Sequence, residues 1–226
     1  MIEGLLLVKK PPGVTSHDVV QVVRRKLAVQ RVGHTGTLDP MAEGLLILLV
    51  GRATKRQREL QAHEKTYEAV LRLGTQTDTG DATGKPVQTA PIPPLDRSRV
   101  AEVLASFQGP LSQRPPAYSA VKVGGRPAYW WARRNQPLTL PARAVHLWDV
   151  TLVHSTAETI MFRVRCSAGM YIRTLAESIA ERLGTVGHLT ALVRLRVGGW
   201  RVEDAKPLSW IAASSPDAVA RELQPI

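Results

Sequence analysis

Two neighbouring strand-like segments constrain the fold of this chain most. Residues 143–154 and 158–166 both have strand patterns, and in the second the apolar side chains of Ile160, Phe162, Val164 and Cys166 occupy every other position. Two strands in a row favour antiparallel pairing, because parallel strands need a long crossover between them. Helices are expected to interleave with strands elsewhere. We therefore predict an α+β fold with a mixed, largely antiparallel sheet flanked by helices, rather than a doubly wound sheet.

Hydrophobic periodicity, capping residues and glycines predict the remaining elements. Strands are expected at 5–8, 45–50, 65–73 and 189–197. Helices are expected from Thr15 or Ser16 to about Leu27, at 52–62, from an Asp96 cap through Phe107, at 126–134 and at 171–183. Residues 74–84 are expected to form a polar loop and 85–95 an irregular Pro-rich segment.

The charge balance indicates a polyanionic partner. Thirty Lys and Arg stand against 19 Asp and Glu, a formal net charge of +11, and such basic domains often bind nucleic acid. The alternative is a basic protein with no such partner. Basic and aromatic residues are interleaved, which suits RNA with exposed bases. The basic clusters are Arg24, Arg25, Lys26 and Arg31; Arg52, Lys55, Arg56 and Arg58; Arg133 and Arg134; and Arg194, Arg196 and Arg201.

Other patterns exclude several classes of protein. The single cysteine, Cys166, allows no intramolecular disulfide and no cysteine-based metal site, and it fits a reducing cytoplasm. The N-terminus lacks a signal-peptide pattern, and the apolar run 45–50 is too short to span a membrane. Six scattered histidines form no metal-binding pair, and no phosphate loop or dinucleotide fingerprint occurs. We expect a cytoplasmic protein that uses neither metal nor cofactor.

Residues 33–44 form the segment best suited to carry chemistry. Three glycines and Pro40 permit a tight loop that presents the carboxylate of Asp39. A rigid loop of this kind can hold a nucleophile or a general base. On spacing alone, an ordinary Asp-Pro turn is the favoured interpretation of Asp39. His34 is equally open as a ligand, a base or a loop hydrogen-bonder.

Five further segments, taken with residues 33–44, resemble the TruB family of tRNA pseudouridine synthases in order along the chain. The central match is Gly33-His34-Thr35-Gly36-Thr37-Leu38-Asp39-Pro40, followed by Ala42-x-Gly44-Leu45-Leu46 and Gly51-x-Ala53-Thr54-Lys55. The others are Lys10-Pro11-x-Gly13-x-Thr15-Ser16, Lys65-Thr66-Tyr67 with Leu73-Gly74 to Gly84, Pro116-x-Tyr118-Ser119-Ala120-x-Lys122, Cys166-Ser167-x-Gly169-x-Tyr171-Ile172-Arg173, and His188-Leu189 with Leu192-x-Arg194. Lys9, Met170 and Leu195 depart from the family's pattern.

This resemblance implies a pseudouridine synthase fold, with a catalytic domain over residues 1–210 and a short tail over 211–226. Family members often carry a C-terminal RNA-binding PUA domain, and too few residues follow position 210 for one. The chain would then be a naturally short member or a truncated one.

The family converts uridine 55 in the T-loop of tRNA to pseudouridine without a cofactor. The resemblance makes Asp39 the nucleophile, and attack at ribose C1′, attack at uracil C6 and a glycal route all remain open. Arg173 would pair with the carboxylate and Tyr67 would stack on the uracil. Tyr171 and Leu192 would shape the nucleotide pocket, and His34 would fill the space of the flipped base. Lys10 and Arg194 would belong to the RNA-binding set.

The target base must leave its stack to be reached, so the basic surface must offset the unstacking. The expected partner is the T-arm of tRNA, with no obligate protein partner and a monomeric enzyme. Three alternatives are a guide-RNA-directed relative, a non-catalytic RNA-binding module and an unrelated Asp-nucleophile hydrolase.

Overall fold

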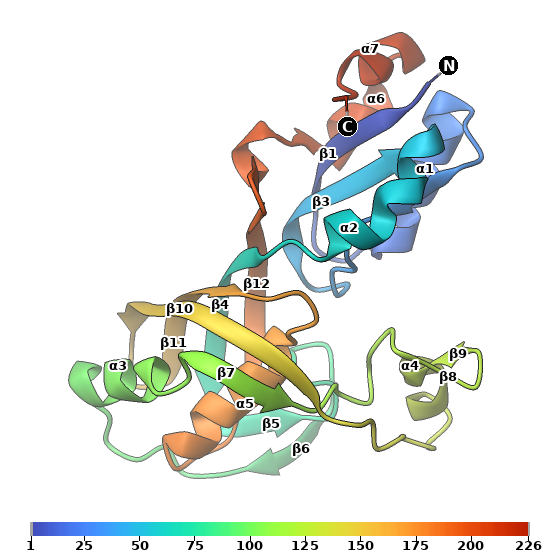
Figure 1. Cartoon of the computed structure of the whole chain (residues 1–226). Helices are drawn as coiled ribbons and strands as arrows, with labels where there is room; N and C mark the ends of the chain where they lie inside the picture. Colours follow the sequence, from blue (N-terminus) through green and yellow to red (C-terminus); the bar gives the residue numbers. More distant parts are fainter. Residues whose placement is uncertain (1, 226) are drawn as a thin grey trace. The chain divides into compact units, whose positions relative to one another are not determined.

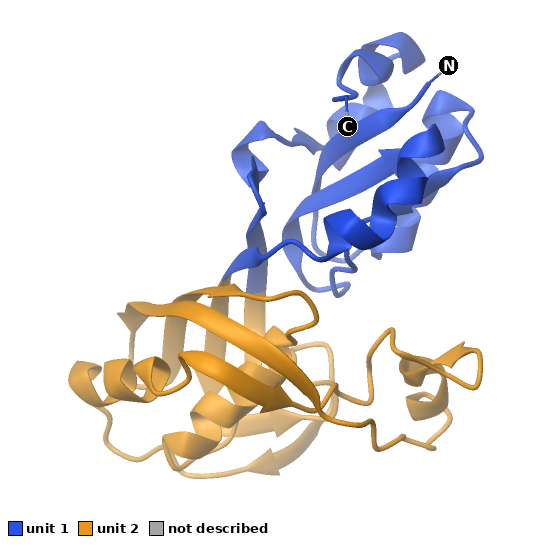
Figure 2. Ribbon diagram, in the orientation of Figure 1, with its two compact units in different colours: residues 1–67, 192–226 blue, residues 68–191 orange. Residues whose placement is uncertain are grey.

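The computed structural model describes residues 2–225, and the chain divides into two compact units (Figure 2). Unit 1 comprises residues 1–67 and 192–226, and unit 2 comprises residues 68–191. The strands β4 (Lys65–Leu73) and β12 (Gly187–Val197) contribute residues to both units. One catalytic domain over 1–210 with a separate tail stays a prediction, although two helices at the C-terminal end fold as part of unit 1.

Unit 1 is built around two long, buried strands (Figure 1). Its elements, besides the ends of β4 and β12, are β1 (Gly4–Lys10), α1 (Ser16–Leu27), β2 (Val32–His34), β3 (Glu43–Val50), the 3-10 helix η1 (Gly51–Arg56), α2 (Gln57–Gln61), β13 (Trp200–Arg201), the 3-10 helix η2 (Val202–Asp204), β14 (Lys206–Pro207), α6 (Leu208–Ala213) and α7 (Pro216–Arg221).

The sheet of unit 1 has the strand order β14-β1-β3-β12. β1 and β3 pair antiparallel from Gly4 opposite Val50 to Lys10 opposite Gly44, whereas β14 joins β1 and β12 joins β3 in parallel. β3 is apolar at successive positions rather than alternate ones, as expected of a strand buried on both faces. One face packs into a cluster that includes Leu7, Ile47 and Leu60.

Helix α1 begins where the sequence predicts. The Thr15 side chain accepts from the Asp18 N–H, and the Asp18 carboxylate accepts in return from the Thr15 N–H. This reciprocal capping box satisfies two backbone donors that the helix itself leaves unpaired. The predicted apolar face of α1, from Val19 to Leu27, is buried.

Unit 2 contains the predicted hairpin. Besides its parts of β4 and β12, it comprises β5 (Thr75–Thr77), β6 (Pro86–Thr89), α3 (Arg97–Ala105), β7 (Gly109–Gln113), β8 (Lys122–Val123), β9 (Arg126–Pro127), α4 (Ala128–Ala132), β10 (Arg143–Ser155), β11 (Thr159–Cys166) and α5 (Ile172–Arg182).

The sheet of unit 2 has the strand order β12-β4-β11-β10-β7. β10 pairs antiparallel with both β11 and β7, which confirms the predicted hairpin. α3 packs on β10 and beside α5. Among the strand pairs whose register is described, β1–β14 and β3–β12 are parallel and the others are antiparallel. This confirms the predicted α+β fold with a mixed, largely antiparallel sheet.

Several short elements differ from the sequence prediction. The helix expected over 52–62 starts as a 3-10 helix and becomes α-helical only at Gln57. The segments expected to be loops contain the β5–β6 hairpin, in which Gln76 lies opposite Gln88, and β2 and β7 were not predicted. These strands are short and largely polar, so they lack the apolar alternation by which a strand is recognised, and their backbone pairing alone defines them.

Candidate active site

Asp39 lies, partly buried, in a loop that α1 holds in place. The Leu38 N–H donates to the Ser16 hydroxyl at 2.9 Å, and this hydroxyl lies 3.2 Å from the Leu38 carbonyl, to which it donates. On the other side, the Gly13 N–H donates to the Pro40 carbonyl at 2.8 Å. The residues before and after Asp39 are therefore fixed by hydrogen bonds to two different segments.

Lys10, at the end of β1, stabilises the Asp39 loop from the protein interior. Its side chain is fully buried, and Nζ donates to the carbonyls of Pro11 at 2.9 Å, Val14 at 2.7 Å and Pro40 at 3.2 Å. Burial lowers the pKa of Lys10 to about 8, and the negative charge of Asp39 opposes that shift. All three donors of the ammonium are thus used within the protein.

Arg194, on β12, also holds the Asp39 loop in place. It is 1% exposed, and its guanidinium donates to the carbonyls of Leu45 at 2.7 Å, Gly36 at 3.0 Å and Thr37 at 3.5 Å. The fork of the guanidinium therefore ties β3 to the loop that precedes Asp39. β12 approaches β3 closely at this point, since a Cβ on Gly44 would lie 2.4 Å from the Arg194 carbonyl oxygen.

His34 ends β2 and is held in its neutral form. The Gly36 N–H donates to Nδ1 at 3.3 Å, so the neutral ring carries its proton on Nε2, and Gln57 Nε2 donates to the His34 carbonyl at 3.1 Å. Burial, followed by the positive charge of Arg194, lowers the pKa of His34 to about 4. At neutral pH the ring is therefore a hydrogen-bond donor through Nε2 and carries no charge.

Two more predicted residues belong to unit 1. Tyr67, on β4, is 9% exposed, and Leu192, on β12, is 5% exposed. Both side chains are buried. Unit 1 therefore contains Asp39 and five of its predicted companions: Lys10, His34, Tyr67, Leu192 and Arg194.

Unit 2 carries the other two predicted residues, Tyr171 and Arg173, at the start of α5. Arg173 is 3% exposed, and its guanidinium donates to the carbonyls of Thr79 at 2.6 Å and Tyr118 at 2.9 Å. The Asp81 carboxylate lies 4.0 Å from Arg173 Nε and accepts from the hydroxyl of Thr83 at 2.6 Å. The direction of the guanidinium is therefore set by a network inside unit 2.

Sequence reasoning missed the residues that hold these groups. Ser16 and Gln113 make hydrogen bonds to the predicted site segments, and Asp81 forms a buried ion pair with Arg173. Each lies within or next to a matching motif, but its partner is distant in sequence. One signal was present, because Lys10 and Arg194 lie beside apolar runs of their strands, where a buried cation must find acceptors.

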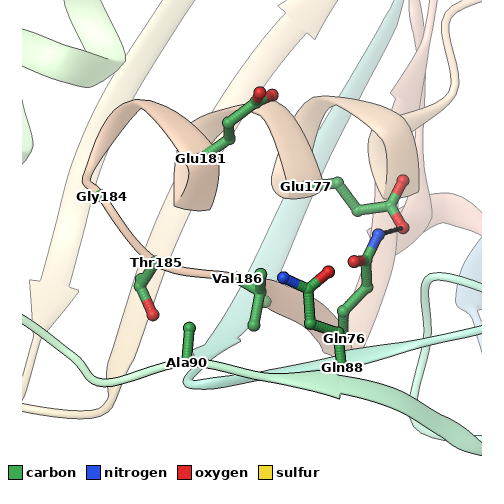
Figure 3. A pocket seen from close by; sticks show the side chains of 9 residues that line it. Gln76, Gln88, Ala90, Glu177, Glu181, Gly184, Thr185 and Val186 are labelled. Atoms are coloured by element: carbon green, nitrogen blue, oxygen red, sulfur yellow. Dashed lines mark hydrogen bonds between the residues drawn. The ribbon is translucent and has the colours of Figure 1, made fainter.

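Unit 2 also contains a cavity of about 460 Å³ (Figure 3). Its lining includes the carboxylates of Glu177 and Glu181 and no lysine or arginine, and Gln76 donates to Glu177 at 3.3 Å. Burial raises the pKa of Glu177 above its usual range. The residues lining the cavity are Gln76, Gln88, Ala90, Glu177, Glu181, Gly184, Thr185, Val186 and Gly187, and none of them belongs to the predicted site.

The predicted basic surface is only partly available to a partner. Arg24 donates to the Val32 carbonyl, Lys26 donates to carbonyls near the C-terminal end, and Arg52 pairs with Glu3. The guanidinium groups of Arg126 and Arg134 lie 4.7 Å and 3.6 Å from the ring centre of Trp130, and Arg134 also donates to the Trp130 carbonyl at 3.2 Å. Cations stacked on an aromatic ring form a surface suited to phosphates and exposed bases.

Within residues 2–225, no group of three or more His, Cys, Asp or Glu side chains is placed to hold a metal ion. Over the same range, none of the helices has the length and apolar character needed to cross a membrane.

Comparisons with known proteins identify related sequences. The sequence model described as TruB family pseudouridylate synthase (N terminal domain) matches residues 24–172. The tRNA pseudouridine synthase B of Opitutus terrae is 40% identical over 225 residues, covering 100% of this chain and 93% of that protein. The enzyme of the same name from Chromohalobacter salexigens is 45% identical over 221 residues, covering 98% of this chain and 71% of that protein.

A solved structure shares the fold. The crystal structure of a Cbf5-Nop10-Gar1 complex contains a chain that superposes with a TM-score of 0.74 at 26% identity, covering 98% of this chain and 60% of that one. The predicted pseudouridine synthase fold is thereby confirmed. Together with the family match over residues 24–172 and the 40% identity to a relative covered almost end to end, this establishes that the chain belongs to the TruB family of pseudouridylate synthases.

Proposed function

We propose that this chain isomerises uridine 55 in the T-loop of tRNA to pseudouridine. The relatives named tRNA pseudouridine synthase B support tRNA as the substrate. The observation that carries the proposal is the Asp39 loop, whose backbone is held by Ser16, Lys10 and Arg194. A carboxylate on a loop braced in this way is preorganised for attack on a nucleotide.

The chemistry is an exchange of bonds within one nucleotide. The glycosidic bond from ribose C1′ to uracil N1 breaks, and a bond from C1′ to uracil C5 forms. The hydrogen on C5 leaves as a proton and N1 gains one, so the product is an isomer of the substrate. No oxidant, reductant or energy donor is required by this balance.

The other predicted residues keep their proposed roles. Asp39 supplies the ionised carboxylate, whether it attacks C1′, attacks C6 or starts a glycal route. Arg173 favours the charged form of the carboxylate at the reacting nucleotide, because a nearby guanidinium stabilises the anion. Tyr67 stacks on the uracil, and Tyr171 and Leu192 shape the pocket.

His34 is proposed to occupy the space of the flipped base as a neutral ring, which agrees with its lowered pKa of about 4. Extrusion of the base costs a few kcal/mol of stacking. Exposed cations, such as Arg126 and Arg134 beside Trp130, would offset this cost through phosphate contacts. Lys10 and Arg194 are buried. We therefore propose that they hold the Asp39 loop in place rather than make the direct RNA contact that the sequence predicts.

The proposed partner is the T-arm of tRNA alone. We propose that the enzyme acts as a monomer in the cytoplasm without a protein partner. The purified chain should therefore modify an isolated T-arm hairpin with nothing else added. A requirement for a second protein or a guide RNA would contradict this part of the proposal.

Tritium release tests the function directly. Unmodified tRNA labelled with tritium at uracil C5 is incubated with the wild-type chain and with Asp39→Asn. Wild type should release tritium to water and Asp39→Asn should not, because the amide is a poor nucleophile and base. Absence of release from wild type would refute the synthase activity, and equal release from both would refute the role of Asp39.

A further inference from the structure

The side-chain amide of Gln113 is paired with the backbone of Tyr171. Gln113 is the last residue of β7 and is 9% exposed. Its Nε2 donates to the Tyr171 carbonyl at 3.0 Å, and the Tyr171 N–H donates to its Oε1 at 2.7 Å. An amide both donates and accepts, so it reproduces the two-point pairing of a neighbouring strand. Both polar atoms of the side chain are thereby used within unit 2.

Tyr171 is the residue at which the chain enters α5. It occupies the N-cap position, and its side chain makes no capping hydrogen bond to the helix. Its carbonyl also accepts the first helical bond, from the Leu175 N–H at 3.1 Å. Gln113 therefore fixes the start of α5 from outside the helix. Arg173 lies two residues further on, in the first helical turn.

The segment that follows Gln113 also holds the guanidinium of Arg173. The Tyr118 carbonyl accepts from Arg173 at 2.9 Å. Residues 114–142 leave the sheet after β7, form β8, β9 and α4, and return at Arg143, which lies opposite Gln113 in the sheet (Figure 1). One stretch of chain thus contacts the backbone of Tyr171 and the side chain of Arg173.

We propose that Gln113 is a positioning residue for pseudouridine formation. Its amide sets the backbone at Tyr171, and with it the directions in which Tyr171 and Arg173 leave the start of α5. The inference rests on the proposed function, in which these two side chains act at the target nucleotide. Gln113 acts through them, so its loss slows the chemical step more than it weakens the binding of tRNA.

Gln113→Met tests this inference, because methionine keeps the length of the side chain and removes both hydrogen bonds. Gln108→Met is the matched control, since Gln108 is exposed just before β7. We measure single-turnover tritium release, the Kd for tRNA and the urea midpoint. The Gln113→Met rate should fall about 100-fold, the loss typical of a misplacement near 1 Å. Its Kd should stay within about threefold of wild type, and Gln108→Met should match wild type in all three measurements.

Gln113→Glu provides a second test that does not depend on Gln113→Met folding. A protonated carboxyl both donates and accepts like the amide, whereas an ionised one cannot donate to the Tyr171 carbonyl. The Gln113→Glu rate, divided by the wild-type rate at each pH, should therefore rise as the pH is lowered from about 8 to about 6, because burial raises the pKa of a carboxyl group. The same ratio for Gln113→Met should stay flat.

Three results would overturn the inference while leaving the function intact. They are a wild-type rate for Gln113→Met, equal losses of rate and affinity, and a flat pH ratio for Gln113→Glu. If the wild-type chain releases no tritium, the proposed function itself fails, and this outcome is distinct from all three.

Discussion

Replacing Arg194 with methionine separates two roles for this side chain. The sequence predicts that Arg194 contacts RNA, yet the residue is 1% exposed and donates to carbonyls of the Asp39 loop and of β3. An RNA contact would show itself in the salt dependence of binding. A brace inside the protein would show itself in stability and in the rate of the reaction.

The hydrogen bonds of Arg194 set the expected magnitude. Methionine keeps part of the apolar stem but leaves the Leu45 and Gly36 carbonyls, now 2.7 Å and 3.0 Å from a donor, without one. A buried acceptor left unpaired costs about 1–3 kcal/mol. The Coulomb repulsion between Arg194 and Lys10 disappears at the same time. We therefore expect a net loss of about 3 kcal/mol in the free energy of unfolding, which lowers Tm by about 6–12 °C.

The assay combines urea unfolding with T-arm binding over a range of salt concentrations. Arg196→Met is the matched control, because Arg196 is exposed on the same strand. Arg194→Met should lower the urea midpoint and leave the slope of log K against log salt unchanged. Arg196→Met should keep the midpoint and reduce that slope by about one. A wild-type midpoint together with a reduced salt slope for Arg194→Met would refute the bracing role.

Three other substitutions have defined outcomes. Gly44→Ala should lower the urea midpoint strongly, because its Cβ would lie 2.4 Å from the Arg194 carbonyl oxygen, whereas Gly199→Ala, with nothing within 4 Å, should not. Burial lowers the pKa of His34 from 6.5 to about 4. Between these pH values the unfolded chain binds a proton at His34 and the folded chain does not, so the free energy of unfolding falls as the pH is lowered through this interval. His34→Gln should flatten that part of the curve of urea midpoint against pH, and an unchanged curve would contradict the neutral ring. Trp130→Ala should weaken T-arm binding about tenfold, because we expect a base to stack on this ring, and an unchanged Kd would exclude such stacking.

The elements predicted correctly have either a simple period of burial or, as in β1 and β3, a continuous apolar run. β4, β10, β11 and α1 carry apolar side chains at strand or helix spacing, and α1 carries its own cap. These signals are local, so they can be read without knowing the partner of the element. The short polar strands β5 and β6 lack such a pattern, because only the backbone of each supplies the other's hydrogen bonds.

The Asp39 motif and the order of the other motifs were enough to place the chain in a family and to make Asp39 its candidate nucleophile. The sequence did not predict which groups surround the cations of Lys10 and Arg194. Lys10 and Arg194 resemble RNA-binding residues in composition, but each also reaches an acceptor far along the chain: the Pro40 carbonyl is 30 residues from Lys10, and the Gly36 carbonyl is 158 residues from Arg194. A buried charge is stabilised by whatever acceptors the fold brings to it, and only the tertiary structure brings these carbonyls together around the loop that presents Asp39.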